Sequence, residues 1–317
     1  MSESKPKVAV MGAGAVGCYY GGMLARAGVP VTLVGRAHHA DAIARHGLTI
    51  VRPDRSDVVS VVAATDPAAV DDADVVLVCV KSPDTVAAAI AMKPHLRSDA
   101  VIVSLQNGVG NADAILDVVG HAVLAAAVWV GAYMEGPGVV RHTGRGDLIL
   151  GVTRAGASRR GAPTHAARIA AMFASAEVAC PVVEDVEKVL WHKLAINCAF
   201  NAVSALGRSR YGRMARDAAT REVMAAAVRE TLAVARVSGI ALDEDEVSSA
   251  VWRTADAMST QYSSTAQDIL RGKPTEIDML NGYVAERGKA LGIDTPVNRT
   301  LHALVRLREA GDDFSGA

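Results

Sequence analysis

The sequence predicts an α/β fold in which an N-terminal Rossmann-type doubly wound sheet with added antiparallel strands precedes an all-α C-terminal domain. The first observation is the order strand, glycine-rich turn, helix and strand over residues 7–34, which is the order of a dinucleotide-binding βαβ unit. The second is the series of helical segments, separated by glycine and proline, from residue 187 to the end. We expect a boundary near residue 184, with domains at residues 1–184 and 185–317.

Size, charge and composition narrow the class of protein. A chain of 317 residues is long enough for two domains, and its net charge of −1 favours neither nucleic acid nor a membrane surface as a partner. The longest apolar run, residues 122–134, is shorter than the roughly 20 residues of a membrane-spanning helix. The polar start MSESKPK lacks the features of a signal peptide. The four cysteines form no CxxC pair and the nine histidines no HxxH or HExxH motif, so we expect free thiols, no metal and a cytoplasmic protein.

The glycine-rich turn predicts a dinucleotide site. In GAGAVG, Gly12 permits the tight turn after the first strand, Gly14 lets a pyrophosphate approach the backbone, and Gly17 lets the helix pack against the strand. The pyrophosphate then lies at the helix N-terminus, where backbone N–H groups are unpaired. A tight turn without a ligand and a site for S-adenosylmethionine are the alternatives. The expected contacts come from Gly12, Ala13, Gly14, Ala15, Val16 and Gly17.

The residue after the second strand discriminates between nucleotides. NAD-dependent enzymes usually place an acid there to hold the ribose 2′-hydroxyl, but here the strand ends in Gly35-Arg36 and the next acid is Asp41. A guanidinium suits a 2′-phosphate in charge and geometry, so NADP is favoured over NAD. Lys81 follows another apolar strand on the same ligand-binding edge and is a second candidate for the 2′-phosphate. A solvated surface charge is the alternative for both cations.

The remaining elements of the first domain are short. Apolar runs and turn residues predict strands at residues 7–11, 29–34, 48–51, 58–63, 74–80, 100–105 and 123–130, antiparallel additions at 139–142 and 148–151, a helix at 164–176 and a strand near Val182. The basic segment 153–163, with Arg159 and Arg160, is expected to be a surface loop. Asn107 follows strand 100–105 and therefore lies on the ligand-binding edge, near the position of a nicotinamide. A plain Asn-Gly turn is the alternative.

One helix, predicted at residues 190–207 and ending at Gly207, dominates the second half of the chain (LWHKLAINCAFNAVSALG). At about 100° per residue, Lys193, Asn197, Asn201 and Ser204 form one polar stripe on an otherwise apolar helix. Buried amine and amide groups need hydrogen-bond partners. Either an internal network or a wet seam between domains satisfies the stripe, or a polar ligand does.

A second segment of the helical half, YSSTAQDILRGKPTEIDMLNGYV, carries further candidates. Ser264 lies at the start of a helix that is expected to end at Arg271, and Thr275 is expected to open the next helix with Glu276 in its first turn. A helix cap is the alternative role for Ser264. A favourable interaction with the helix dipole is the alternative for Glu276.

Four motifs occur in order along the chain: GAGAVG, SLQNGVGN, WHKLAINCAFNAVSAL and SSTAQDILRGKPTEIDMLNG. Together they resemble the ketopantoate reductase (2-dehydropantoate 2-reductase) family over nearly the whole chain. The resemblance implies NADPH-dependent reduction of a 2-oxo acid, in pantothenate and coenzyme A biosynthesis, at a cleft between a Rossmann domain and a helical domain. Residues 1–184 would then bind NADP, and residues 185–317 would hold the substrate and the catalytic groups.

The resemblance also implies roles for individual residues. Lys193 becomes the general acid, which stabilises the charge on the ketone oxygen and protonates it, and Glu276 lies near this lysine and the cofactor. Asn107 lies between the nicotinamide and the substrate. The other implied contacts are to the substrate from Asn197, Asn201 and Ser264, to the 2′-phosphate from Arg36 and Lys81, and to the nicotinamide from the backbone of Ala132.

Two positions depart from the family pattern. The family has Asn three residues before the serine and Met directly after it, where this chain has Gln261 and Thr265. Because that Asn helps to hold the substrate, the departure bears on which 2-oxo acid is reduced. The alternatives are a related NADPH-dependent reductase of another 2-oxo acid and a non-catalytic NADP-binding sensor; a methyltransferase does not explain Arg36. The apolar C-terminal helices would suit a homodimer.

Overall fold

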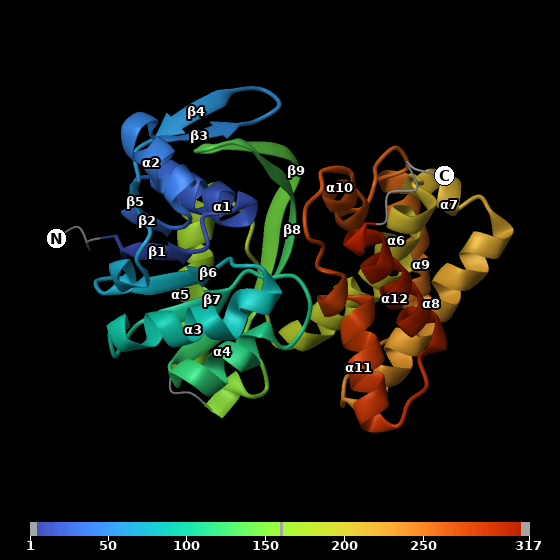
Figure 1. The fold of residues 1–317 in the computed structure, drawn as a ribbon. Coiled ribbons are helices and arrows are strands. Elements are labelled where there is room, and N and C mark those ends of the chain that lie inside the picture. Colours follow the sequence, from blue (N-terminus) through green and yellow to red (C-terminus); the bar gives the residue numbers. More distant parts are fainter. Residues whose placement is uncertain (1–4, 159–160, 312–317) are drawn as a thin grey trace. The chain divides into compact units, whose positions relative to one another are not determined.

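The computed structural model describes residues 5–158 and 161–311. Residues 1–4 of the polar start, and Arg159 and Arg160 of the basic loop, lie outside the described residues. The chain forms two compact units, Met1–Val186 and Glu187–Ala317. The first is built on a sheet and the second is helical (Figure 1), which confirms the predicted fold class.

The described part of the first unit holds a ten-stranded sheet in the order β4-β3-β9-β8-β7-β6-β1-β2-β5, with β10 paired to β9. Strands β8, β7, β6, β1, β2 and β5 run parallel, whereas β9 is antiparallel to β8 and β4 is antiparallel to β3. The strands are β1 (Val8–Met11), β2 (Val31–Val34), β3 (Leu48–Val51), β4 (Ser56–Val59), β5 (Val62–Ala64), β6 (Val75–Val78), β7 (Val101–Ser104), β8 (Ala122–Gly136), β9 (Val139–Gly151) and β10 (Val182–Val183). The long β8–β9 hairpin is the antiparallel addition expected from the sequence (Figure 1).

Helices cover both faces of the parallel strands, which is why these strands are apolar at nearly every position. The helices of this unit are α1 (Ala15–Arg26), α2 (Ala37–His46), α3 (Thr85–Met92), α4 (Asn111–Val119) and α5 (Ala162–Ser175). Alternate strand residues such as Val10 and Leu77 share one core with α1 and α5. In this core, Tyr20 of α1 meets Phe173 of α5 edge to face, with ring centroids 5.9 Å apart. α3 and α4 pack against each other, and α4 lies against β7 and β8 (Figure 1).

Two strand predictions are wrong, because strand pairing is decided by distant residues. The predicted strand 58–63 is two strands: Val58 in β4 pairs with Thr49 at one edge of the sheet, and Val62 in β5 pairs with Thr32 at the opposite edge. The predicted strands 139–142 and 148–151 are one strand, β9. It follows β8 throughout, with register shifts that absorb its irregular middle.

The described part of the second unit is helical. Its elements are α6 (Val186–Gly207), α7 (Tyr211–Met214), α8 (Ala218–Val237), α9 (Glu244–Ala257), α10 (Ser264–Leu270), α11 (Asn281–Leu291) and α12 (Pro296–Ala310), with a 3-10 turn η5 at Ile277–Met279. The helix predicted at residues 190–207 is confirmed and begins one turn earlier, at Val186. The expected helix start at Thr275 is wrong: Thr275 and Glu276 are not helical, and α11 begins only at Asn281.

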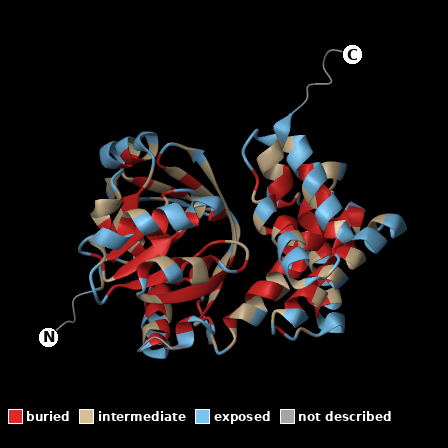
Figure 2. Ribbon diagram, turned by 60° about the horizontal axis from the view of Figure 1, so that its bottom comes forward, coloured by how far each residue is buried: buried red, intermediate tan, exposed pale blue. Residues whose placement is uncertain are grey.

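α6 contributes many buried residues to the core of this unit. Buried residues, red in Figure 2, lie inside both units. Phe200 packs with residues of α7, α8 and α9, and its ring stacks on Tyr211 with centroids 4.3 Å apart. A buried polar network ties the later helices to α6: Glu230 accepts hydrogen bonds from the first amides of α12, and Asn281 donates to Asn298 and to the Cys198 carbonyl. Among the described residues, none of the helices combines the length and apolar character that crossing a bilayer requires.

The four thiols are expected to be unreactive in the native protein. All are free, and burial raises the pKa of Cys18, Cys180 and Cys198 to about 12 and also raises the pKa of Cys79. The reactive thiolate is therefore scarce at pH 8. A disulfide-exchange reagent should detect little thiol in native protein over minutes, and four thiols per chain in guanidinium chloride. Rapid labelling of native protein would contradict this burial.

Candidate functional site

The glycine-rich turn joins β1 to α1 in the manner that a dinucleotide site requires. Gly12 has φ +114°, a conformation that L-residues rarely adopt, and a Cβ there would lie 2.6 Å from the Val80 nitrogen at the end of β6. A Cβ on Gly17 would collide with the Gly12 carbonyl oxygen. Both glycines are therefore needed by the fold, one for the turn and one for the approach of α1 to the strand.

Gly14 is different, because apart from its neighbours along the chain no atom of the described residues lies within 4 Å of the position its Cβ would occupy. Its backbone, φ −88° and ψ −167°, is open to any residue. Gly14 is also the N-cap of α1, it provides no side-chain cap, and the first turn of α1 carries no acid. The turn thus leaves open space beside a helix N-terminus, which is the arrangement that accepts a pyrophosphate. Ala13, Ala15 and Val16 complete this segment.

The two predicted 2′-phosphate residues flank the glycine-rich turn. Arg36 follows β2 and Lys81 follows β6, and these strands are the two neighbours of β1 in the sheet. A Cβ on Gly35 would lie 2.5 Å from the Ala13 Cβ, so the backbone that leads to Arg36 runs beside the turn. Both cations are exposed, and the Arg36 guanidinium has no ion-pair or hydrogen-bond partner within the described part of the chain. Arg36 is thus available to an anionic ligand at this edge.

Asn107 lies in the loop after β7, and hydrogen bonds from two side chains hold its backbone carbonyl. Its carbonyl oxygen accepts hydrogen bonds from Ser82 Oγ (3.1 Å) and Asn111 Nδ2 (2.8 Å), and the residue itself is half-buried. Gly108 and Gly110 next to it have φ +89° and +83°. Asn107 therefore lies in a bend at the carboxyl end of β7, and its role as a ligand contact stays a prediction.

Ala132 does not follow the strand as the sequence predicts. β8 continues to Gly136, and Ala132 lies inside it, paired with His142 of β9 directly after a register shift at Gly131. The predicted strand ends at Val130, whereas pairing with β9 extends the observed strand to Gly136. A bulge re-aims the backbone groups around it, and Ala132 is half-buried there.

The polar stripe of α6 divides into two parts. Ser204 is fully buried and internally satisfied, because its Oγ donates to the Ser209 carbonyl (2.7 Å) and accepts from the Ser263 amide (3.2 Å). Lys193 and Asn197 are half-buried, one turn apart. Across the described chain, no hydrogen bond from the Asn197 side chain is found. The internal network therefore satisfies Ser204, whereas the Asn197 side chain is left for a polar ligand or a wet seam.

α10 brings a predicted substrate residue to α6. Asn201 is 2% exposed, and its Nδ2 donates to Ser264 Oγ at 3.4 Å. Ser263, not Ser264, is the N-cap of α10: its Oγ accepts from the Ala266 amide and donates to the Asn201 carbonyl. The cap alternative for Ser264 is therefore wrong, and its exposed hydroxyl remains beside Asn201.

Glu276 lies in a non-helical segment that α12 holds in place. Thr275 N donates to Glu309 Oε1 (2.5 Å), and Asp278 pairs with His302 (2.6 Å) and Arg306 (3.6 Å). Only the short turn η5 follows Glu276, and the Glu276 side chain does not cap that turn. The structure therefore gives no helix dipole with which this carboxylate could interact. The half-buried carboxyl of Glu276 is held between two contacts with α12.

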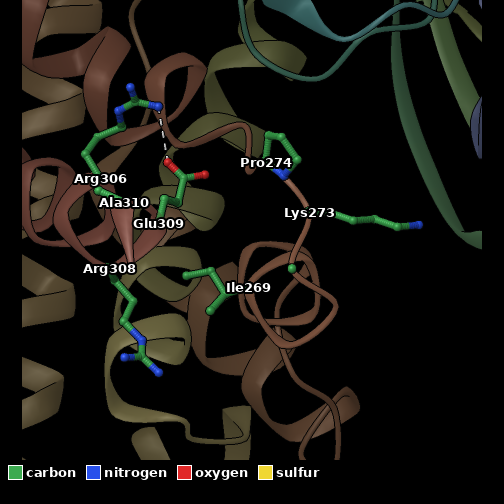
Figure 3. A pocket seen from close by; sticks show the side chains of 8 residues that line it. Ile269, Lys273, Pro274, Arg306, Arg308, Glu309 and Ala310 are labelled. Atoms are coloured by element: carbon green, nitrogen blue, oxygen red, sulfur yellow. Dashed lines mark hydrogen bonds and ion pairs between the residues drawn. The ribbon is translucent and has the colours of Figure 1, made fainter. Parts of the chain in front are cut away.

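A pocket of about 400 Å³ lies between residues 269–274, at the end of α10 and just after it, and the end of α12. In Figure 3, Arg306 and Glu309 point toward each other, whereas Lys273 and Arg308 extend away in different directions. The cationic side chains therefore do not converge on one point in the pocket. Elsewhere, the described residues contain no group of three or more His, Cys, Asp or Glu side chains suited to a metal ion.

One part of the candidate site was missed from the sequence. Gln106, Thr85 and Asn111 are buried polar residues beneath the Asn107 loop and are joined by hydrogen bonds. The signal was a polar residue, Gln106, at the end of an apolar strand. Gln106 bonds Thr85, which lies in an earlier segment and in turn bonds Asn111, so no local pattern reveals the connection.

Comparisons with known proteins cover both units. The family model described as "Ketopantoate reductase PanE/ApbA" matches residues 8–155, and "Ketopantoate reductase PanE/ApbA C terminal" matches residues 185–309. A 2-dehydropantoate 2-reductase of Halobacterium salinarum is 36% identical over 306 residues, which are 96% of this chain and 99% of that protein.

Solved structures agree with this match. A PanE/ApbA family ketopantoate reductase from Ralstonia eutropha JMP134 is 50% identical, with a TM-score of 0.88 over 96% of this chain and 98% of that chain. A ternary structure of D-mandelate dehydrogenase with NADH and anilino(oxo)acetate is 25% identical, with a TM-score of 0.87 over 96% and 98%. These relatives support a nicotinamide cofactor. The chain therefore belongs to the ketopantoate reductase family, and it is an oxidoreductase that acts on a CH–OH group.

Proposed function

We propose that this protein reduces 2-dehydropantoate (ketopantoate) to D-pantoate with NADPH, and that Lys193 is the general acid. Residues 1–184 would be the NADP-binding domain and residues 185–317 the substrate and catalytic domain. Ketopantoate is the substrate named for the curated relatives. The observation that carries the proposal is the row of Lys193, Asn197 and Asn201 along α6, with Ser264 hydrogen-bonded to Asn201.

The chemistry follows from what these side chains offer. A bound nicotinamide supplies a hydride to the ketone carbon. As negative charge develops on the ketone oxygen, the Lys193 ammonium stabilises it and donates a proton from Nζ. Asn197, Asn201 and Ser264 are neutral donors that orient the carboxylate and hydroxyl groups of the acid. Asn107 would contact the nicotinamide and the substrate, and Glu276 would lie near Lys193.

NADPH is proposed over NADH on the charge at the end of β2. Arg36 stands where an NAD enzyme usually has an acid, and the sequence offers no acid before Asp41. Lys81 on the other side of β1 adds a second positive charge at this edge. The open space at Gly14 and the uncapped start of α1 fit the pyrophosphate, and the backbone near Ala132 is proposed to lie beside the nicotinamide.

Removing the Arg36 charge is expected to change nucleotide preference. Arg36→Ala should weaken NADPH binding by about tenfold or more, the equivalent of one lost charge-assisted hydrogen bond, and leave NADH affinity within about twofold. Fluorescence titration with both nucleotides measures this. Arg45→Ala is the control, because it removes an exposed arginine from α2, the helix that begins directly after Arg36. Equal loss of affinity for both nucleotides would show that Arg36 does not read the 2′-phosphate.

The substrate is tested by following NADPH oxidation with ketopantoate, pyruvate, 2-oxoisovalerate and benzoylformate. We expect ketopantoate to lead in kcat/KM by orders of magnitude. A lead for another acid would favour the second candidate, a reductase of a different 2-oxo acid. Two observations favour that candidate: the likeness to D-mandelate dehydrogenase, and the exposed Gln261 just before α10 where the family has Asn.

The same assay also tests whether the protein is an enzyme. Tight NADPH binding without turnover on any 2-oxo acid would indicate a non-catalytic sensor.

Homodimerisation is part of the proposal, since Leu304 and Leu307 of α12 expose 44% and 66% of their surface. Light scattering on the purified chain measures its mass directly.

A further inference from the structure

We propose that Gln106, Thr85 and Asn111 are positioning residues of the active site, which fix the backbone of Asn107 through a buried chain of hydrogen bonds. The inference rests on the proposed function, because it concerns the residue expected to contact nicotinamide and substrate. It adds three residues to which neither the family motifs nor the sequence analysis assigns a role.

The chain of hydrogen bonds runs from β7 to the Asn107 carbonyl. Ser104 Oγ donates to Gln106 Oε1 (3.0 Å), and Gln106 Nε2 donates to Thr85 Oγ1 (2.6 Å). Thr85 Oγ1 donates to Asn111 Oδ1 (3.2 Å), and Asn111 Nδ2 donates to the Asn107 oxygen (2.8 Å). All four side chains in the chain are buried, with at most 6% exposed.

The two ends of this chain of hydrogen bonds determine which atom donates and which accepts in every bond. Gln106 Nε2 also donates to the Val80 carbonyl at 3.0 Å, and a carbonyl only accepts, so the amide of Gln106 has one orientation. At the other end, the Asn107 carbonyl also only accepts, so the Asn111 amide must present its nitrogen. The Thr85 hydroxyl between them accepts from one amide and donates to the other. A chain with one permitted arrangement is rigid, and its members polarise one another.

This chain fixes the peptide between Asn107 and Gly108. The Asn107 oxygen accepts a second bond from Ser82 Oγ (3.1 Å), whose residue is 6% exposed. Because the peptide group is planar, two bonds on its oxygen set the orientation of the whole group. A rotation there would leave two buried donors unpaired, which is strongly unfavourable.

The arrangement joins the carboxyl ends of β6 and β7, the edge at which parallel sheets bind ligands. Apolar side chains of similar volume would fill this space without the cost of burying amides. The polar chain instead supplies what an apolar core cannot, a defined backbone orientation at Asn107. Displacement of a positioned group by about 1 Å can cost on the order of a hundredfold in rate.

A double-mutant cycle tests the inference. Thr85→Val replaces the hydroxyl by a methyl group of the same shape, Thr85→Ser keeps the hydroxyl, and Asn111→Ala removes the donor to Asn107. Each change is made in the wild type and in Asn107→Ala. kcat and KM are measured with NADPH and the best 2-oxo acid, with NADPH affinity by fluorescence and the thermal midpoint of each variant.

We expect Thr85→Val and Asn111→Ala to lower kcat/KM by about tenfold, with NADPH affinity within about threefold. Thr85→Ser should keep the activity. In the Asn107→Ala background, neither Thr85→Val nor Asn111→Ala should lower kcat/KM further, because interacting residues are not additive. Thr153→Val is the control. Thr153 is also a buried threonine, and its hydroxyl donates to Asp113 (2.7 Å), which lies in α4 as Asn111 does. It makes no hydrogen bond to Asn107.

Equal losses in both backgrounds would overturn the inference, because the residues would then act independently of Asn107. Full activity in Thr85→Val and Asn111→Ala would overturn it as well. If Thr85→Val does not fold, Asn111→Ala carries the cycle. Failure of the proposed function looks different: wild-type protein would then oxidise NADPH with none of the 2-oxo acids.

Discussion

Lys193→Ala is expected to lower kcat about a thousandfold and to leave NADPH affinity nearly unchanged. A general acid contributes roughly 10²–10⁴ to a rate, and Lys193 lies on α6 in the second unit, whereas the proposed nucleotide contacts of the glycine-rich turn, Arg36 and Lys81 belong to the first. Single-turnover oxidation of NADPH and fluorescence titration of the nucleotide measure the two quantities separately.

Two variants separate the role of Lys193 from that of a general positive charge. Lys193→Arg keeps the charge but does not release a proton readily, because a guanidinium stays protonated, so it should also lose most of its turnover. Lys188→Ala removes an exposed lysine from the same helix and should leave turnover unchanged. Equal turnover in Lys193→Ala and wild type would refute the assignment. Full activity in Lys193→Arg would indicate electrostatic stabilisation without proton transfer.

The second large effect is expected at the glycine-rich turn. One alanine substitution there should lower the stability of the fold, and another should lower NADPH affinity while the fold stays stable. Gly17→Ala places a methyl group against the Gly12 carbonyl and 2.8 Å from Val10 Cγ1. Because the backbone must shift, the free energy of unfolding of the first unit should fall by about 1–3 kcal/mol or more. Cofactor binding should be lost with it.

Gly14→Ala is the matched partner, since its methyl group meets no described atom within 4 Å beyond its neighbours along the chain. Its unfolding free energy should change by less than about 1 kcal/mol, the scale of an N-cap change. NADPH affinity should nevertheless fall by about tenfold or more, because the methyl group occupies the space through which a pyrophosphate approaches. Calorimetry without ligand and nucleotide titration distinguish the two variants. Unchanged affinity in Gly14→Ala would place the pyrophosphate elsewhere.

Much of the fold is readable from the sequence where the physical cause is local. The β1–turn–α1–β2 unit follows from apolar runs and glycine spacing, and α6 from an apolar surface with helical period. The polar stripe on α6 is likewise local, because residues at i, i+4 and i+8 share a face whatever surrounds them. Lys193, Asn197 and Asn201 were therefore identifiable before the structure.

Other features depend on which distant residues meet. The separation of β4 from β5 is decided by pairing with β3 and β2 at opposite edges of the sheet. Thr275 and Glu276 stay outside a helix because Glu309, more than thirty residues later, binds the Thr275 amide that a helix start would leave unpaired. Ser263 caps α10 by accepting from the Ala266 amide, and its hydroxyl also donates to the carbonyl of Asn201, a residue far away in the sequence.

The sequence by itself determined the chemical groups of this protein: an open glycine turn, a cation after β2, and a lysine with two amides along one helix. Only the tertiary structure decided how each group is held. It buries Ser204 completely and leaves Lys193 and Asn197 half-buried, and it places Thr85, Gln106 and Asn111 beneath Asn107. The reason is physical: periodicity sets which residues share a face, whereas hydrogen bonds between distant segments set orientation.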